Sequence, residues 1–451
     1  MHSAAGPTRR SLLAWAAGAG LAGALGAQPL ALPPLGLQSR RLDNGLAVIA
    51  VPMSSSTVAV QLWYRVGSKD DPIGRSGFAH LFEHMMFKST RHLASEQFDR
   101  LTEDVGGSNN AFTAEDMTVY HSVVPANHLE PLLWAEAERM ANLNVDQAAF
   151  ESERAVVREE YRQRVLADPY GRLFNAIPAY GYQQHPYKRP VIGNIEELDA
   201  ATLKDVRDFH AAYYRPDNAV LIVAGAFDPG RLDAWVDHYF GSIPKPRGMV
   251  PQVAVAEPRR TREERHRMAA PGVPLPAALL IWQGPRSDST DVPALQLAQA
   301  LLAQGDSARL AEALVYREHA AQSIGFELLL NADAGLLAAH AIAAGPDRPE
   351  ALLERLAREI ERLAEEPVQP RELDKAKAQL LTQALIDRET PEGRALAVGN
   401  ALLLRGSAAA AEREIPQLLA VTQAEVQRAL RRYVLQGARV ELLYLGEGAA
   451  R

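Results

Sequence analysis

The chain contains an internal repeat, and this feature restricts its fold more than any other. Residues 201–225, ATLKDVRDFHAAYYRPDNAVLIVAG, parallel residues 421–446, VTQAEVQRALRRYVLQGARVELLYLG. In each segment a threonine precedes a helical pattern and an apolar run with β-branched residues follows, which predicts a capped helix leading into a strand. Because self-similar segments mark duplicated structural units, we expect two related domains.

The length of the chain agrees with two domains, because 451 residues exceed what one hydrophobic core ordinarily serves. Further strand-like runs, separated by long helical patterns, lie at 46–52, 57–67 and 219–227. Such alternation is typical of an α+β or α/β layer architecture. The segment 246–268 is rich in proline and charge and lacks a sustained period. It is predicted to link an N-terminal domain, 37–245, to a C-terminal domain, 269–451.

Residues 1–27 are predicted to be an export signal. Paired arginines, Arg9 and Arg10, precede a weakly apolar stretch rich in Ala and Gly, and small residues follow where a peptidase could cut. The arginine pair resembles a twin-arginine signal more than a general secretory one. An uncleaved membrane anchor is the alternative, but Ala and Gly contribute little insertion energy. We therefore expect a bacterial periplasmic protein with no stable membrane insertion after the signal is removed.

Composition excludes several classes of partner and site. The formal net charge is −7, and no cluster of Lys and Arg is interleaved with aromatic residues, so nucleic acid is not an expected partner. The chain has no cysteine, which excludes disulfides, thiolate metal sites and a cysteine nucleophile. Any metal ion must therefore be held by His, Asp or Glu.

The segment 77–90, GFAHLFEHMMFKST, places two histidines and a glutamate in an apolar run that has the pattern of a buried helix. His80 and His84 are four residues apart, so their rings share one helix face and can point at one ion. Glu83, directly before the second histidine, lies close enough to hold a metal-bound water. The pattern is H-x-x-E-H, the inverted form of the zinc-protease motif. Zinc accepts two imidazoles and a carboxylate and keeps a fourth position for water.

A third ligand is required, and the predicted helix 150–165 offers four candidates, Glu151, Glu153, Glu159 and Glu160. Glu153 and Glu160 are separated by about two helical turns and so share a face. One of the two can bind the metal while the other supports a ligand by a hydrogen bond. Without such a partner, two histidines at helical spacing are as readily an ordinary core or surface pair.

Five blocks of the sequence resemble, in the same order, the pitrilysin-like zinc metallopeptidases. The blocks are LDNGLAVIAVP, WYRVGSKDDPIGRSGFAHLFEHMMFKST, GGSNNAFTAEDMTVYHSVVP, HPYKRPVIGNIEEL and YYRPDNAVLIVAGAF. The similarity is to the branch of short, two-domain subunits similar to mitochondrial processing peptidase and its bacterial relatives, and it covers essentially the whole chain after the export signal. It implies an α+β fold of two homologous domains, each a mixed, mainly antiparallel sheet packed with helices.

The resemblance also implies a metal site and a reaction. His80, His84 and Glu160 would hold one Zn²⁺ per chain. Glu83 would be the general base that activates the zinc-bound water for attack on a peptide carbonyl. Glu153, one heptad before Glu160, matches a second glutamate that assists catalysis in the family.

The block 106–124 has a glycine pair followed by alternating side chains, so it is predicted to be a turn leading into a strand. In the family this edge strand pairs with the backbone of the peptide substrate. Asn110 and Ala111 are therefore the predicted substrate-binding residues, with an ordinary turn and strand start as the alternative. Three other histidines have no helical partner and are predicted to be structural or solvent-exposed, namely His92, His121 and His185.

The second half departs from a complete active site. Its counterpart of the zinc motif, 295–305, offers only Leu, Ala, Gln and Gly. Active members of the family also carry an arginine and a tyrosine in the C-terminal domain, and in the matching window, 314–322, Val315 and Gln322 occupy those positions. In two-subunit relatives a homologous subunit supplies this pair. We therefore predict a heterodimer with a zinc-less homologous subunit, in preference to a homodimer.

Together these features predict a zinc-dependent endopeptidase that hydrolyses extended peptides in a closed chamber formed with the partner subunit. A non-catalytic scaffold that retains the fold is the alternative, although a scaffold has no need of a general base. A third hypothesis is a peptide-binding module in which zinc is a structural ion.

Overall fold

The computed structural model describes residues 34–345 and 348–447, and from residue 35 onward the chain forms one compact unit. The export signal predicted for residues 1–27 lies outside the described residues. Within the described part of the chain, no helix is long and apolar enough to cross a membrane.

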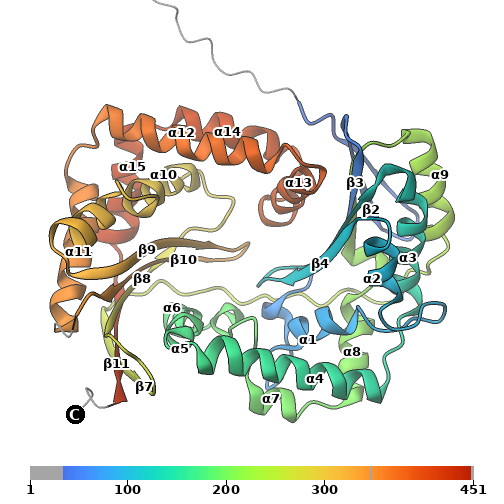
Figure 1. The fold of residues 1–451 in the computed structure, drawn as a ribbon, viewed down its shortest axis with the longest axis horizontal. Coiled ribbons are helices and arrows are strands. Elements are labelled where there is room, and N and C mark those ends of the chain that lie inside the picture. Colours follow the sequence, from blue (N-terminus) through green and yellow to red (C-terminus); the bar gives the residue numbers. More distant parts are fainter. Residues whose placement is uncertain (1–33, 346–347, 448–451) are drawn as a thin grey trace, which may run out of the picture. The chain divides into compact units, whose positions relative to one another are not determined.

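Two β-sheets organise this unit, and helices cover them (Figure 1). The first sheet has the strand order β1-β2-β6-β3-β5-β4, and its neighbouring strands are antiparallel except β2 and β6. Its strands are β1 (Gln38–Arg41), β2 (Ala47–Pro52), β3 (Thr57–Tyr64), β4 (Ser108–Thr113), β5 (Thr118–Pro125) and β6 (Ala219–Gly225). The second sheet has the order β7-β11-β8-β10-β9 and is antiparallel except for β7 and β11. Its strands are β7 (Glu264–Ala270), β8 (Ala277–Gly284), β9 (Ala321–Leu330), β10 (Gly335–Ala343) and β11 (Arg439–Gly446).

Helices connect the strands of both sheets. Those of the first half are α1 (Phe78–Met85), α2 (Gln97–Glu103), α3 (Leu129–Asn142), α4 (Gln147–Tyr161), α5 (Gly171–Asn175), α6 (Ile177–Gly181), α7 (Ile195–Asp199), α8 (Leu203–Tyr213) and α9 (Pro229–Phe240). Those of the second half are α10 (Val292–Ala303), α11 (Pro349–Glu365), α12 (Pro370–Asp387), α13 (Pro391–Arg405), α14 (Ala410–Ala420) and α15 (Gln423–Leu430). Short π-helical segments lie at Arg162–Ala167, Ala311–Arg317 and Arg431–Leu435.

The two sheets repeat one plan, which confirms the predicted α+β fold with two related halves. Each sheet has a parallel pair toward one end and a hairpin at the other, β4–β5 in the first sheet and β9–β10 in the second. The repeated segments form α8 with β6 and α15 with β11. In both helices a threonine side chain, Thr202 or Thr422, accepts the N–H of an acidic residue, Asp205 or Glu425, whose carboxylate accepts a hydrogen bond in return.

One strand lies where a linker was expected. β7 begins at Glu264, inside the segment 246–268. It lies at the end of the second sheet, paired with β11, and most of its side chains are exposed or half-buried. An edge strand of this kind has no apolar pattern that separates it from a charged linker. The domain boundaries themselves, 37–245 and 269–451, stay predictions.

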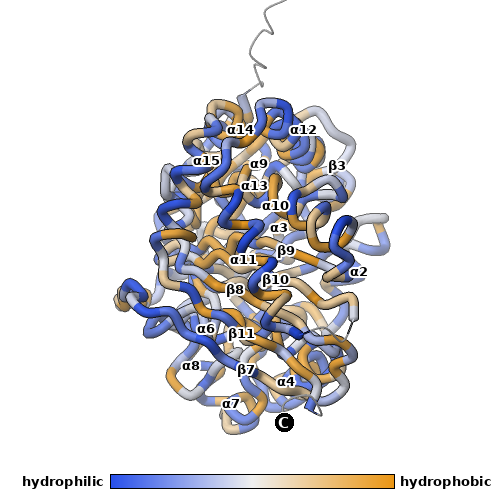
Figure 2. Tube along the Cα trace, turned by 90° about the vertical axis from the view of Figure 1, so that its left-hand side faces the viewer, coloured by the Kyte–Doolittle hydropathy of each residue, from blue (hydrophilic) through white to orange (hydrophobic). Residues whose placement is uncertain are grey.

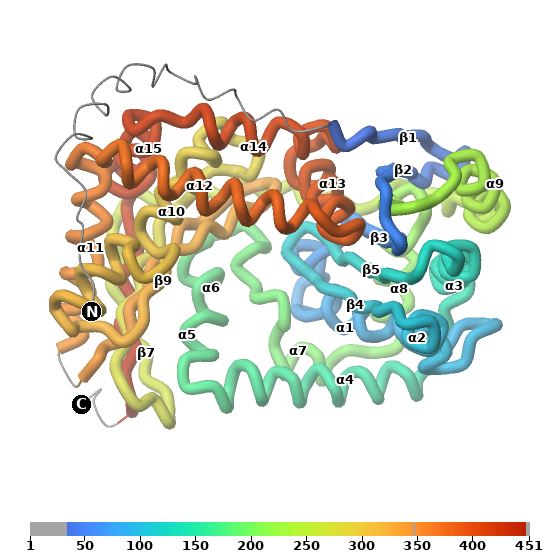
Figure 3. The backbone as a smooth tube through the Cα atoms, turned by 45° about the horizontal axis from the view of Figure 1, so that its top comes forward, coloured from blue at the N-terminus to red at the C-terminus, as the bar shows by residue number. Residues whose placement is uncertain are grey.

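The two halves exchange helices (Figures 1 and 3). On one face of the first sheet, Trp63 of β3 lies in a hydrophobic cluster that Val398 and other residues of α13 and α14 complete. On one face of the second sheet, Leu336 of β10 lies in a cluster that Ile177 and other residues of α5 and α6 complete. Gly399 of α13 comes so close to Trp63 that a Cβ there would lie 2.1 Å from the indole ring. Each sheet therefore depends on the other half of the chain to bury one of its faces.

The opposite face of the first sheet carries α1, α3 and α8 in the largest hydrophobic cluster. From α1 this cluster takes Phe78, Leu81, Phe82 and Met85, each at most 1% exposed. This burial fixes the position of α1 and leaves its histidines on the face that turns toward α4.

Helix α11 is amphipathic, with Leu and Ile at helical spacing and Glu and Arg between them. In α11 the buried side chains recur at helical spacing and include Leu352, Leu356, Ile360 and Leu363. Figure 2 shows hydrophilic and hydrophobic residues alternating along the helices of the second half. The apolar face of α11 packs against the second sheet, and its charged face is turned to solvent.

Candidate metal centre

The helix that carries the motif begins in an unusual way. Gly77, its N-cap residue, has φ 96°, a left-handed conformation that glycine adopts without a steric penalty. Since glycine has no side chain to cap the helix, Asp71 does so from a preceding loop: its carboxylate accepts the N–H groups of Gly77 at 2.7 Å and Ala79 at 2.8 Å. The first turn, which includes His80, is thereby held by a carboxylate from the loop that precedes the helix.

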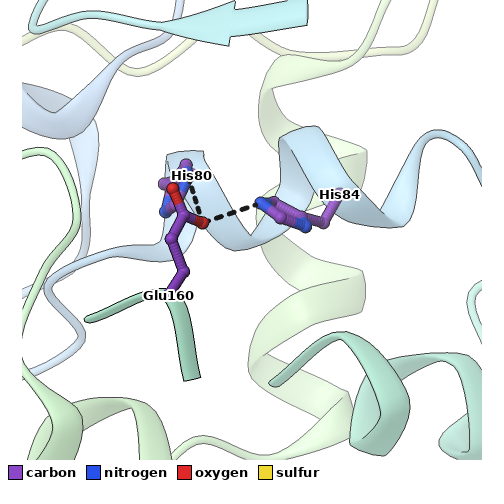
Figure 4. Close-up of side chains that lie close together, drawn as sticks. All are labelled: His80, His84 and Glu160. Atoms are coloured by element: carbon purple, nitrogen blue, oxygen red, sulfur yellow. Dashed lines mark ion pairs between the residues drawn. The ribbon is translucent and has the colours of Figure 1, made fainter. Parts of the chain in front are cut away.

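The structure brings together the three predicted ligands, His80, His84 and Glu160 (Figure 4). One ligand atom from each lies within 4.8 Å of the others. The Nε2 atoms of both histidines are 3.5 Å from the same oxygen, Oε2 of Glu160. The histidines come from α1, and Glu160 comes from the last turn of α4, which packs beside α1. All three side chains are partly or largely buried, with 10%, 22% and 17% exposed, respectively.

Each glutamate of α4 that faces the histidines is also held by a cation. Glu153 Oε2 lies 3.6 Å from Nδ1 of His84, and its Oε1 lies 2.7 Å from Nζ of Lys88. Glu160 Oε1 lies 2.7 Å from the guanidinium of Arg164. The two ring nitrogens of His84 therefore face two different carboxylates, one at the predicted metal position and one behind it, as is usual for a metal-binding histidine.

Glu83 lies beside this cluster and contacts the first sheet. Its Oε2 accepts a hydrogen bond from Oγ1 of Thr113, the last residue of β4, at 2.5 Å. Burial raises the pKa of Glu83 above its usual value, and the hydrogen bond from Thr113 partly offsets this rise. A partly buried carboxylate at the wall of a site has the character of a general base.

The two histidines differ in protonation. Burial and the neighbouring His84 lower the pKa of His80, so its imidazole is neutral at pH 7. Burial also opposes charge on His84, but the Glu153 and Glu160 carboxylates outweigh it and raise the pKa of His84 to about 9. A cation that binds to both Nε2 atoms would therefore displace a proton from His84.

The chemistry of this cluster fits a zinc ion. Two imidazole nitrogens and one carboxylate oxygen point at one position, and such convergence of acceptor atoms is favourable only when a proton or a cation lies among them. Two nitrogen ligands with one oxygen ligand suit Zn²⁺ and leave a coordination position open. Among the described residues, this is the one group of three His, Asp or Glu side chains close enough to hold a metal ion.

Comparison with known proteins then identifies the family. The family model described as "Insulinase (Peptidase family M16)" matches residues 48–195, and the model "Peptidase M16 inactive domain" matches residues 200–380. The zinc protease PqqE of Helicobacter pylori is 32% identical over 346 residues, which cover 75% of this chain and 77% of PqqE. The chain belongs to peptidase family M16.

Solved structures and further relatives agree with this M16 assignment. A protease from Helicobacter pylori superposes with a TM-score of 0.88 at 27% identity, covering 91% of this chain and 99% of that one. The periplasmic protease PqqL of Escherichia coli shares the fold, with a TM-score of 0.73 at 19% identity, and the match covers 48% of PqqL. Subunit beta of the mitochondrial-processing peptidase of Saccharomyces cerevisiae is 27% identical over 219 residues, 48% of this chain and 47% of that subunit. Several of these relatives are named as proteases or peptidases, which supports a protease as the kind of protein.

The predicted substrate-binding residues lie on an open strand of the M16 chain. Asn110 and Ala111 belong to β4, the edge strand of the first sheet. Oδ1 of Asn110 accepts the N–H of Ala111 at 2.8 Å, so this amide is not used by β5 and points to the open edge. An incoming peptide strand would find a main-chain donor there once the Asn110 side chain moves aside.

The three lone histidines lie outside the cluster. His92 pairs with Glu138 at 3.1 Å, and His121 pairs with Glu392 of α13 at 2.7 Å. His185 is buried, and its Nδ1 accepts the N–H of Tyr187. Each has a partner that accounts for it structurally.

The second half of the chain contains the positions at which the sequence differs from a complete active site. Residues 295–303 lie in α10 and mostly face the core. Val315 belongs to the π-helical segment Ala311–Arg317, and Gln322 lies at the start of β9. Arg317, the arginine nearest to the expected position, points toward Glu359 of α11 at 3.7 Å.

Sequence reasoning missed several residues that hold the site. Asp71 caps the first turn of α1, and Lys88 pairs with Glu153. Thr113 donates a hydrogen bond to Glu83, and Arg164 pairs with Glu160. Arg164 follows Glu160 by one helical turn, a spacing that favours an ion pair and could have been noticed. The other three reach their partners from loops or from β4, and such contacts leave no periodic signal.

Proposed function

We propose that the chain is a zinc-dependent endopeptidase that hydrolyses extended peptides. The observation that carries this proposal is the convergence of His80, His84 and Glu160 beside the carboxylate of Glu83 and next to an open strand edge. A passive binding module needs the strand edge, but neither such a module nor a scaffold has a use for a partly buried carboxylate beside the ligands.

The residues have distinct tasks in this reaction. Zinc, when bound by His80, His84 and Glu160, would polarise the scissile carbonyl and increase the acidity of water. β4 aligns the peptide by main-chain hydrogen bonds. Glu83 takes a proton from the attacking water and then gives it to the departing amine nitrogen. Glu153 holds the His84 ring so that Nε2 faces the metal position.

A homologous subunit without zinc would complete the site in this proposal. Val315 and Gln322 replace the arginine and the tyrosine that would stabilise charge on the substrate carbonyl, a contribution that can amount to about 3 kcal/mol. A partner with both residues would supply it and would close the chamber. The match to about half of PqqL, 48%, and to a protein named as a subunit supports a division of the site between two such units.

The proposed location is the bacterial periplasm. It rests on the paired arginines and the weakly apolar stretch of residues 1–27. Fusing these residues to a reporter and fractionating the cells tests this location directly, and a reporter that stays in the cytoplasm would contradict it.

Turnover of a quenched fluorescent peptide library tests the enzyme. The zinc-loaded chain is assayed alone and with a homologous subunit that carries the arginine and tyrosine, beside the variants Glu83→Gln and Glu159→Gln. We expect Glu83→Gln to retain zinc and peptide but to lose turnover by about 10²- to 10⁴-fold. Glu159, on the same helix but 55% exposed, is the matched control and should leave the rate unchanged.

Each outcome selects a function. Activity in the mixture that Glu83→Gln abolishes supports a metallopeptidase with a divided site. Stoichiometric zinc and peptide binding without turnover in any mixture would replace the proposal with the binding or scaffold role.

A further inference from the structure

The strand that offers its edge to a peptide also holds the general base. Ala111 and Thr113 are two residues apart on β4, so their side chains point to the same face of the sheet. On that face Ala111 packs against the main hydrophobic cluster, and Thr113 reaches Glu83 of α1. β4 and α1 lie side by side in Figures 1 and 3.

The geometry gives Thr113 a definite role in orienting Glu83. The Oγ1 to Oε2 distance of 2.5 Å is typical of a hydroxyl that donates to a charged carboxylate. Among the described residues, Thr113 is the hydrogen-bond donor to Glu83. A carboxylate with one donor has its plane set by that donor, because the terminal torsion of glutamate is otherwise broad.

Thr113 is itself held rigidly. It pairs with Thr118 at the end of the β4–β5 hairpin, and Oγ1 of Thr118 donates to the carbonyl of Val66 at 2.9 Å. The two heavy atoms on the Cβ of threonine restrict its χ1 torsion, which keeps Oγ1 directed at α1. The hydroxyl is therefore part of the strand's fixed geometry.

We propose that Thr113 is a positioning residue that orients the Glu83 carboxylate beside the strand edge at which a peptide would dock. A strand added at the open edge beside Ala111 lies two residues from the group that aims the base. This inference rests on the proposed peptidase function and adds a residue that neither the motif nor the predicted ligand set includes.

Kinetics of Thr113→Val and Thr113→Ser test the inference. Valine keeps the shape of threonine and removes the hydroxyl, whereas serine restores the hydroxyl. We expect Thr113→Val to lower kcat by about ten- to hundredfold, the effect of losing one hydrogen bond to a charged group, with little change in KM. Thr113→Ser should recover most of kcat. Thr57→Val, which removes a hydroxyl at the far end of β3, is the matched control and should leave kcat unchanged.

Two readouts separate positioning from a structural role. Bound zinc and the Kd of a labelled peptide for the metal-free chain should be the same in Thr113→Val as in the wild type. In the Glu83→Gln background, adding Thr113→Val should cost no further activity, because the base it positions is already absent. Where valine impairs folding, Thr113→Ser against Thr113→Ala gives the same comparison.

The outcomes also distinguish this inference from the proposed function. A wild-type chain without turnover in any mixture overturns the proposed function. An active wild type with Thr113→Val of equal kcat, or with kcat losses that add fully to those of Glu83→Gln, overturns the positioning role alone.

Discussion

Replacing Gly399 by alanine tests whether the exchange of helices between the two halves holds the chain together. The new Cβ would lie 2.1, 2.3 and 2.6 Å from three ring atoms of Trp63. The ring has little room to move, because it is fully buried and its Nε1 donates to Gln61 Oε1 at 3.0 Å. Overpacking of this kind costs about 1–3 kcal/mol, and the better helix propensity of alanine returns about 1 kcal/mol. Because the neighbour is a rigid ring, the upper end of the overpacking cost applies, about 3 kcal/mol. Less the gain in helix propensity, we expect the free energy of unfolding to fall by about 2 kcal/mol.

Two further glycines calibrate this value. Gly181, at the end of α6, makes the reciprocal contact: its Cβ would lie 2.3 Å from Cδ1 of Leu336, a buried side chain whose end has more rotamers than the rigid indole ring. Gly181→Ala should therefore cost less than Gly399→Ala. Gly230 is exposed in the first turn of α9, where the nearest atom to a Cβ is 3.4 Å away, so Gly230→Ala should be neutral or stabilise the chain by up to about 1 kcal/mol.

Urea unfolding followed by both tryptophan fluorescence and far-UV circular dichroism measures the series. Coincident transitions are needed for a single free energy of unfolding. If Gly399→Ala were as stable as Gly230→Ala, the close packing of α13 on the first sheet would not hold in solution, and the argument for interdependent halves would fail.

The remaining predictions concern the metal centre and its supports. Lys88→Met leaves the buried Glu153 carboxylate without its ammonium partner and should lower the free energy of unfolding by about 1–3 kcal/mol, whereas Lys204→Met, in an exposed pair, should leave it nearly unchanged; equal effects in urea titrations would contradict the difference. Burial raises the pKa of Asp71 from 3.8 to about 7, so the folded chain binds a proton that the unfolded chain releases, and the free energy of unfolding should fall as the pH rises from about 4 to about 7. Asp71→Asn does not titrate and should reduce this slope, to which Asp70, with its pKa raised to about 6, also contributes; an unchanged slope would refute the assignment. Removing zinc with a chelator should lower the thermal unfolding temperature and abolish turnover, and added Zn²⁺ should restore both; an unfolding temperature that ignores the chelator would contradict the metal site.

Some of the site could be predicted because its geometry is local. His80 and His84 are one helical turn apart, and a single helix is enough to bring their rings together. Glu160 required the family resemblance, because the spacing along α4 does not by itself separate four glutamates. Packing separates them: Glu153 is buried, Glu160 faces the histidines and Glu159 is largely exposed.

The sequence by itself determined the elements whose causes lie within one segment. The repeated cap and strand at Thr202 and Thr422 and the H-x-x-E-H turn were all predicted from short patterns and are present in the structure. The halves of the α+β fold follow from this repetition, because each helix and strand obeys its own hydrophobic period.

Only the tertiary structure decided which segments meet. The exchange of α5 and α6 for α13 and the hydrogen bond from Thr113 to Glu83 join residues that are far apart in sequence. The cap that Asp71 places on α1 is closer in sequence, but it depends on how the loop before the helix folds back. Such contacts have no periodic signature, because they depend on how the apolar faces of whole sheets are buried and not on the spacing of neighbouring residues. A single polar side chain at the end of a strand therefore acquires its role only when the fold brings a carboxylate within 2.5 Å of it.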